Sequence, residues 1–190
     1  MTPTLIEAPS VEPVSLAEMK AHLRLSSTDE DELIGKLIVA ARLTIEAATG
    51  CELISQRWRV VMNRWPSDGV VRLPVKPLIS CDAVRVYSDA TTSATLPSSH
   101  YYVDRFASPP RIVLLTAPAE PGRATSGVEI DVTVGYGASA TSPPEALRQA
   151  VVRLAARWFE RRGDDPLEEA EIALPQDVAT LIAPYRDFRI

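Results

Sequence analysis

The chain has 190 residues, 46% of them hydrophobic, and a formal net charge of −5 at pH 7. A chain of this length buries about 70% of its unfolded surface, so we expect one compact domain, or one and a half. The acidic balance disfavours broad binding to nucleic acid, which requires a basic surface. Cys51 and Cys81 are too few for a disulfide framework and lack the spacing of a metal site.

The first elements along the chain predict a helical start. Residues 1–13 lack the basic start and apolar stretch of a signal peptide, and no apolar run approaches the roughly 20 residues that span a bilayer. We therefore expect a soluble, cytoplasmic protein without membrane contact. Ser15 and Glu18 form a capping box, which predicts a helix over residues 16–25.

A second helix follows at once. Ser27 and Glu30 form another capping box, and the acidic residues 29–32 lie where the helix dipole is positive. Apolar residues then recur at three- and four-residue spacing until Gly50, the predicted C-terminal cap: Leu33, Leu37, Ala41, Ile45 and Ala48. Two helices joined by a short turn also resemble a helix-turn-helix, but carboxylates at the start of the second helix would repel DNA phosphates.

The middle of the chain changes to a period of two. Trp58, Val60 and Met62 fall on one face, and further strands are expected at residues 70–73, 83–87, 101–103, 111–115 and 128–134. The connections are too short for crossover helices, which favours antiparallel pairing. About six strands would form a small sandwich or a curled sheet.

No catalytic constellation stands out in this middle part. His100 with Asp104 is the best available base pair for a nucleophile, yet no nucleophile elbow or phosphate-binding glycine motif lies nearby. We therefore expect no enzyme, no catalytic residue, no cofactor and no metal.

A third helix is predicted near the end of the chain. Ser142, two prolines and Glu145 form its start, and Gly163 is expected to end it. One face is apolar, and the other carries Arg153, Arg157 and Arg161. The arginine row fits a solvated face, or a seam of ion pairs between subunits.

The final segment begins with acidic residues 164–171 and ends in an aromatic and arginine-rich sequence, PYRDFRI. This ending fits a docking peptide, or a frayed terminus. The predicted fold class is α+β: a helical-bundle scaffold of two N-terminal helices and one long C-terminal helix, with an inserted small antiparallel β domain and an extended C-terminal arm. The expected parts are 1–54, 55–137, 138–163 and 164–190.

Several local sequences, in their order, resemble the head-tail connector (adaptor) proteins of tailed phages, prophages and gene transfer agents. The entrance helices correspond to VSLAEMKAHLRL and LIVAARLTIEAATG, and the first β hairpin region to LPVKPLISCDAVRVY. The closing helix and terminal arm correspond to VTVGYGASATSPPEALRQAVVRLAARWFERRGD and LPQDVATLIAPYR. Together these sequences cover nearly the whole chain in the order of the family.

The resemblance implies a structural, non-enzymatic protein. It would form a ring of twelve copies in the neck of a phage-like particle, after assembly in the bacterial cytoplasm. The ring would lie between the portal protein and the stopper or tail and would extend the DNA channel without sequence-specific DNA binding. The alternatives are another tail-completion or stopper protein and, less favoured, a small cytoplasmic enzyme or regulator.

The resemblance also implies two sets of contact residues. The portal-binding candidates are Tyr185, Arg186, Phe188 and Arg189. The subunit-interface candidates are Asp29, Asp31, Arg153, Arg157 and Arg161. A ring contact needs two different complementary patches, and the acidic start of the second helix and the arginines of the third provide opposite charges.

Overall fold

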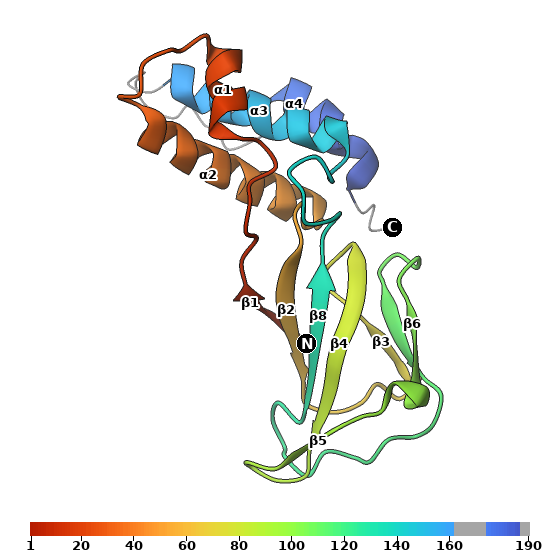
Figure 1. Cartoon of the computed structure of the whole chain (residues 1–190). Helices are drawn as coiled ribbons and strands as arrows, with labels where there is room; N and C mark the ends of the chain where they lie inside the picture. The colour runs from red at the N-terminus through yellow and green to blue at the C-terminus, as the bar shows by residue number, and fades with distance from the viewer. Residues whose placement is uncertain (162–173, 187–190) are drawn as a thin grey trace. The chain divides into compact units, whose positions relative to one another are not determined.

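The computed structural model describes residues 1–161 and 174–186. The chain divides into two compact units, each closed by segments that are distant in sequence (Figure 1). One, here called the β unit, comprises Met1–Ser10 and Ser55–Gly137; the other, the helical unit, comprises Val11–Ile54 and Ala138–Ile190, as far as these residues are described.

The first helix of the helical unit, α1 (Leu16–Leu23), has the predicted start. The Ser15 hydroxyl accepts a hydrogen bond from the Glu18 N–H at 3.1 Å, which satisfies one of the donors left over at a helix N-terminus. Arg24 ends the helix in the left-handed conformation, with φ 57°. Met19 is the buried residue of this helix.

The long helix α2 (Asp31–Thr49) begins differently from the prediction. Its N-cap, Glu30, makes no side-chain cap, and the Ser27 hydroxyl instead donates to the Asp29 carboxylate at 2.6 Å. The second capping box is therefore wrong. Gly50 ends the helix as predicted, at φ 66°, a conformation that costs glycine little.

Helix α3 (Glu145–Glu160) starts after Pro144 without a side-chain cap. The predicted cap, Ser142, instead accepts a hydrogen bond from the Ser139 N–H at 3.2 Å. The predicted end at Gly163 lies outside the described residues.

A fourth helix, α4 (Gln176–Ile182), continues into a 3-10 turn, Ala183–Tyr185. Both Val178 and Ile182 are buried, and α4 packs on α3, which also contacts α1 and α2. The large side chains buried in this unit include Val14, Met19, Ile34, Ile38, Ile45, Leu147, Leu154 and Phe159.

The β unit contains two antiparallel sheets. The five-stranded sheet has the order β1 (Thr2–Glu7), β2 (Gln56–Met62), β8 (Val128–Val134), β4 (Leu78–Tyr87), β5 (Ser93–Thr95). The three-stranded sheet has the order β3 (Val70–Arg72), β7 (Arg111–Leu114), β6 (Tyr101–Asp104), and a 3-10 turn, Ser98–His100, precedes β6.

Alternation along β8 and β2 builds the core of the β unit. The four aliphatic residues of β8 are fully buried, and Val60 and Met62 of β2 are buried beside them. Val71 of β3 and Ile112 of β7 join the same core. The predicted period of two in these segments is thus confirmed, because only one side of each strand packs against the core.

The predicted fold class is wrong. The described residues form four α-helices and two antiparallel sheets of eight strands in total, so the β part is no small insertion into a helical bundle. The N-terminal segment, expected to carry no strand, is β1, an edge strand with every residue exposed. Part of the expected extended arm is α4. Both elements depend on partners distant in sequence, which local periodicity does not show.

Candidate interaction surfaces

The two predicted interface acids lie at the start of α2. Asp31 forms an ion pair with Lys20 of α1 at 2.6 Å, so it ties α1 to α2 within the helical unit. Asp29 is exposed and accepts the hydrogen bond from Ser27. The structure thus brings both acids to one end of α2, but engages Asp31 inside the subunit.

The three predicted interface arginines follow α3 at four-residue spacing, and all three are exposed. Arg153 forms an ion pair with Asp177 of α4 at 3.2 Å, and both side chains are half exposed. Arg157 has no ion pair within the described part of the chain, and Arg161 follows the last helical residue. The row therefore combines one arginine that links two helices with arginines directed to solvent.

The described portal-binding candidates follow α4. Tyr185 is half-buried in the 3-10 turn, and its carbonyl oxygen lies 3.8 Å from the Cys51 thiol. Arg186 is exposed and comes next in the chain. Phe188 and Arg189 lie outside the described residues. The buried anchors of α4 thus bring Tyr185 to the end of α2 and leave the Arg186 side chain accessible.

A buried charge cluster in the helical unit was not predicted. Arg42 and Glu46 of α2 are 5% and 6% exposed, and the guanidinium bonds Glu46 at 2.7 Å and Glu12 at 2.7 Å. The second Glu46 oxygen accepts from the Leu53 N–H at 2.9 Å. Burial raises the pKa of the Glu46 carboxyl, and these hydrogen bonds offset only part of that effect. The signal in the sequence is an Arg and a Glu four residues apart on the apolar face of a helix.

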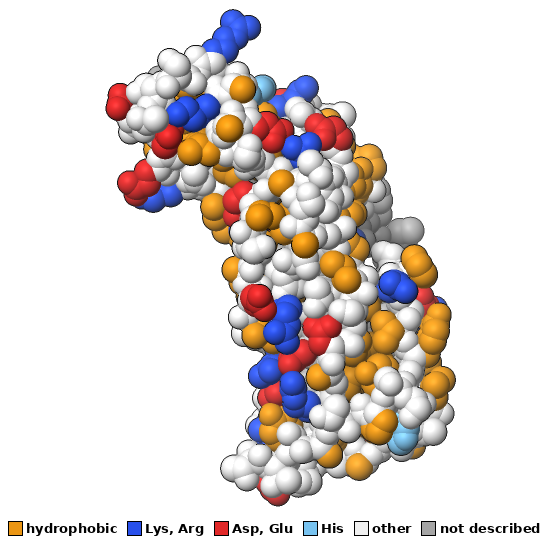
Figure 2. Space-filling view, in the orientation of Figure 1, with side chains coloured by type: hydrophobic (Ala, Val, Ile, Leu, Met, Phe, Trp, Pro, Cys, Tyr) orange, Lys and Arg blue, Asp and Glu red, His pale blue; other side chains and the backbone are white. Residues whose placement is uncertain are grey.

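A second unpredicted charge cluster covers the outer face of the five-stranded sheet. Asp131 of β8 is 2% exposed and accepts hydrogen bonds from Arg59 and Arg85, each at 2.7 Å. Burial alone would raise the pKa of the Asp131 carboxyl, but the two arginines hold it below its usual value. Acidic and basic side chains intermingle over β2, β8 and β4 in Figure 2. This face therefore compensates its charges within the β unit.

The outward face of α2 is apolar instead. Val39 is 36% and Leu43 54% exposed, and Ala40 and Ala47 lie exposed beside them. Between Lys36 and Gly50, the charged residues of α2 are Arg42 and Glu46, and both are buried. Over these turns α2 directs its charges inward and its apolar side chains outward, the reverse of an ordinary surface helix.

The candidate chemistry from the sequence is not assembled. Asp104, the predicted partner of His100, instead forms an ion pair with Arg111 at 3.0 Å. Among the described residues, no group of three or more His, Cys, Asp or Glu side chains is placed to hold a metal ion. None of the described helices has the length and apolar character of a membrane span.

Comparison with known proteins identifies the family. Residues 13–105 match the model of the phage gp6-like head-tail connector proteins. The whole chain also resembles a chain in the neck of an empty GTA particle computed with C6 symmetry, at 30% identity and a TM-score of 0.85, covering 100% of this chain and 97% of that chain. The chain belongs to the phage head-tail connector family.

Two further solved structures agree with this assignment. A chain in the virion of a native gene transfer agent (GTA) particle and one in the neck of a native GTA particle computed with C12 symmetry each match at 30% identity, with a TM-score of 0.83, covering 100% of this chain and 97% of that chain. No curated protein matches. The connector is a structural protein with an adaptor role, as the resemblance implied.

Proposed function

We propose that this connector forms a closed ring of twelve copies in the neck of a phage-like particle. The ring lies between the portal protein and the stopper or tail, and the DNA channel continues through it. The observation that carries the proposal is the likeness over the whole chain to a chain in a GTA neck computed with C12 symmetry.

Exposed opposite charges support a contact between neighbouring subunits. A cyclic ring joins two different patches of each copy, and the helical unit offers Asp29 at the start of α2 and Arg157 with Arg161 along α3. Asp31 and Arg153 belong to the same proposed contact but act through position, since their partners within the subunit are Lys20 and Asp177.

The segment after α4 is the proposed portal contact. Tyr185 and Arg186 follow a short helix anchored in the helical core, and Phe188 and Arg189 continue the same sequence. A chain of aromatic and arginine residues suits an interface, because both residue types are enriched where contacts contribute most to binding.

The acidic balance of the chain supports passage of DNA rather than its retention. Firm binding to DNA depends on basic side chains that neutralise phosphates, whereas the net charge of this chain is −5. A conduit built from such subunits lets DNA slide through without sequence-specific contacts.

The test is quantitative mass spectrometry of purified tailed particles from the source cell, comparing copies of this chain with copies of the portal protein. A ratio near one to one is expected for a ring matched to the portal. Absence of the chain from the particles would overturn the proposal.

A further inference from the structure

We infer that the apolar stripe of α2, defined by Gly35, Val39, Ala40 and Leu43, is the surface that packs against a neighbouring copy of this chain. The inference rests on the proposed ring and specifies which face of the helical unit closes it. A shallow open depression runs along this stripe, and Glu32 and Lys36 complete its lining.

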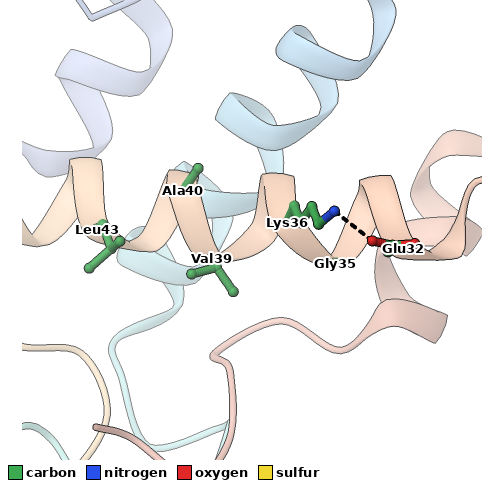
Figure 3. A pocket seen from close by; sticks show the side chains of 6 residues that line it. All are labelled: Glu32, Gly35, Lys36, Val39, Ala40 and Leu43. Carbon is green, nitrogen blue, oxygen red and sulfur yellow. Dashed lines mark hydrogen bonds and ion pairs between the residues drawn. The ribbon is translucent and has the colours of Figure 1, made fainter.

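Exposure and chemistry make the stripe unusual for a solvated helix. Val39 and Leu43 project from the same side of α2 in Figure 3, and the only ion pair on this face joins Lys36 and Glu32 at 2.5 Å at one end of the depression. The remaining lining is apolar, while Arg42 is buried on the opposite side of the helix. Contiguous exposed apolar surface with a polar rim is typical of a protein interface.

Gly35 is a second, independent observation. Glycine in the interior of a helix is less favourable than alanine, so its presence needs a reason. A Cβ built at Gly35 meets nothing within 4 Å, so packing within the described chain provides none. Close approach of another molecule does, because the missing side chain lets a partner reach the helix backbone.

The occupant is a second copy because solved relatives stand in necks computed with C6 and C12 symmetry. In such a ring every copy presents the same face to a different face of its neighbour, so a stripe of this kind is covered all around the ring. Its only charged members, Lys36 and Glu32, neutralise each other, so the stripe suits an apolar surface of the neighbour without a charged counterpart.

The test replaces Leu43→Glu in cells that produce particles and lack the native chain. Leu43 is exposed, so the isolated variant should melt near the wild-type temperature, whereas its copies per portal protein in purified particles should fall at least tenfold. Leu43→Met, which keeps the apolar contact, should retain the wild-type ratio. Leu115→Glu, an equally exposed leucine of the β unit, is the matched control and should also retain it.

A second variant excludes misfolding as the cause. Gly35→Ala should raise the melting temperature of the isolated chain through helix propensity, yet lower its incorporation into particles. Incorporation of Leu43→Glu and Gly35→Ala at the wild-type ratio would overturn the inference and leave the ring proposal intact.

A photoreactive amino acid at position 43 separates this inference from the proposed function. A crosslink between two copies of the chain supports the stripe as the contact. A crosslink to another virion protein, or within one copy alone, overturns it. Absence of the wild-type chain from particles overturns the ring itself, and the same crosslink measured on the purified chain then decides whether the stripe joins two copies.

Discussion

At the scale of single residues, the helical unit places two carboxylates around one buried guanidinium. Arg42 bonds both Glu46 and Glu12, so the cluster holds more negative than positive charge away from water. Burial first, and the nearby Glu12 charge in addition, raise the pKa of Glu46. Removal of the guanidinium would leave a buried carboxylate without its counter-charge, the situation in which broken buried pairs are most costly.

Arg42→Met should therefore lower the free energy of unfolding by about 3–5 kcal/mol at pH 7. A carboxyl with a raised folded-state pKa contributes stability that is present below its unfolded pKa and is lost as pH rises through the folded one. The loss should accordingly grow as pH rises above the ordinary Glu range near 4.5. Urea unfolding of wild type and variant at pH 4, 5, 6 and 7 measures both effects.

The control on the same helix is Lys36→Met. Lys36 and Glu32 have the same four-residue spacing, but their side chains are largely exposed, so the change should stay within about 0.5 kcal/mol. Equal losses for Lys36→Met and Arg42→Met would contradict the role assigned to the buried cluster.

At the scale of elements, α4 shows how a short helix depends on packing. Seven residues are too few to form a stable helix in water, and α4 has no side-chain N-cap. Its stability comes from Val178 and Ile182, which are buried, and from the Arg153–Asp177 ion pair. The same packing positions the proposed portal contact that follows it.

Ile182→Ala should lower the free energy of unfolding by about 2–5 kcal/mol, because a buried aliphatic side chain is replaced by a cavity. Asp177→Ala removes only a half-exposed ion pair and should cost no more than about 1 kcal/mol. Chemical denaturation of both variants gives the comparison. A larger loss for Asp177→Ala than for Ile182→Ala would show that charge, rather than packing, holds α4.

At the scale of the whole molecule, the proposed ring requires charges that remain available after each subunit has folded. The outer face of the five-stranded sheet pairs its charges within the β unit, and Arg153 is engaged by Asp177. Arg157 is exposed without an ion pair in the described part of the chain. It is therefore the arginine best suited to meet an acid of a neighbouring copy.

Arg157→Glu should reduce the number of copies per portal protein at least tenfold while the isolated chain keeps its melting temperature within a few degrees. Arg157→Lys retains the positive charge and should restore most of the incorporation. Arg64→Glu reverses an exposed arginine of the β unit and controls for net charge. Particles that contain Arg157→Glu at the wild-type ratio would remove this residue from the subunit contact.

Local patterns in the sequence were enough for much of the secondary structure. Ser15 caps α1, Gly50 ends α2, and alternation along residues 128–134 forms β8, because caps and periodicity depend on neighbours in sequence. The serines at positions 27 and 142 also looked like caps, but each bonds elsewhere. A short polar side chain has several local partners, and the sequence does not rank them.

The sequence by itself determined the family and the order of the main helices and strands, since both depend on local patterns in a set order along the chain. Only the tertiary structure decided that Thr2–Glu7 joins β2 as an edge strand, that the β part forms two sheets, and that Arg42 and Asp131 are buried. These features require contacts between residues far apart in sequence. The energy of such contacts depends on a geometry that exists only after folding, so composition and periodicity carry no trace of it.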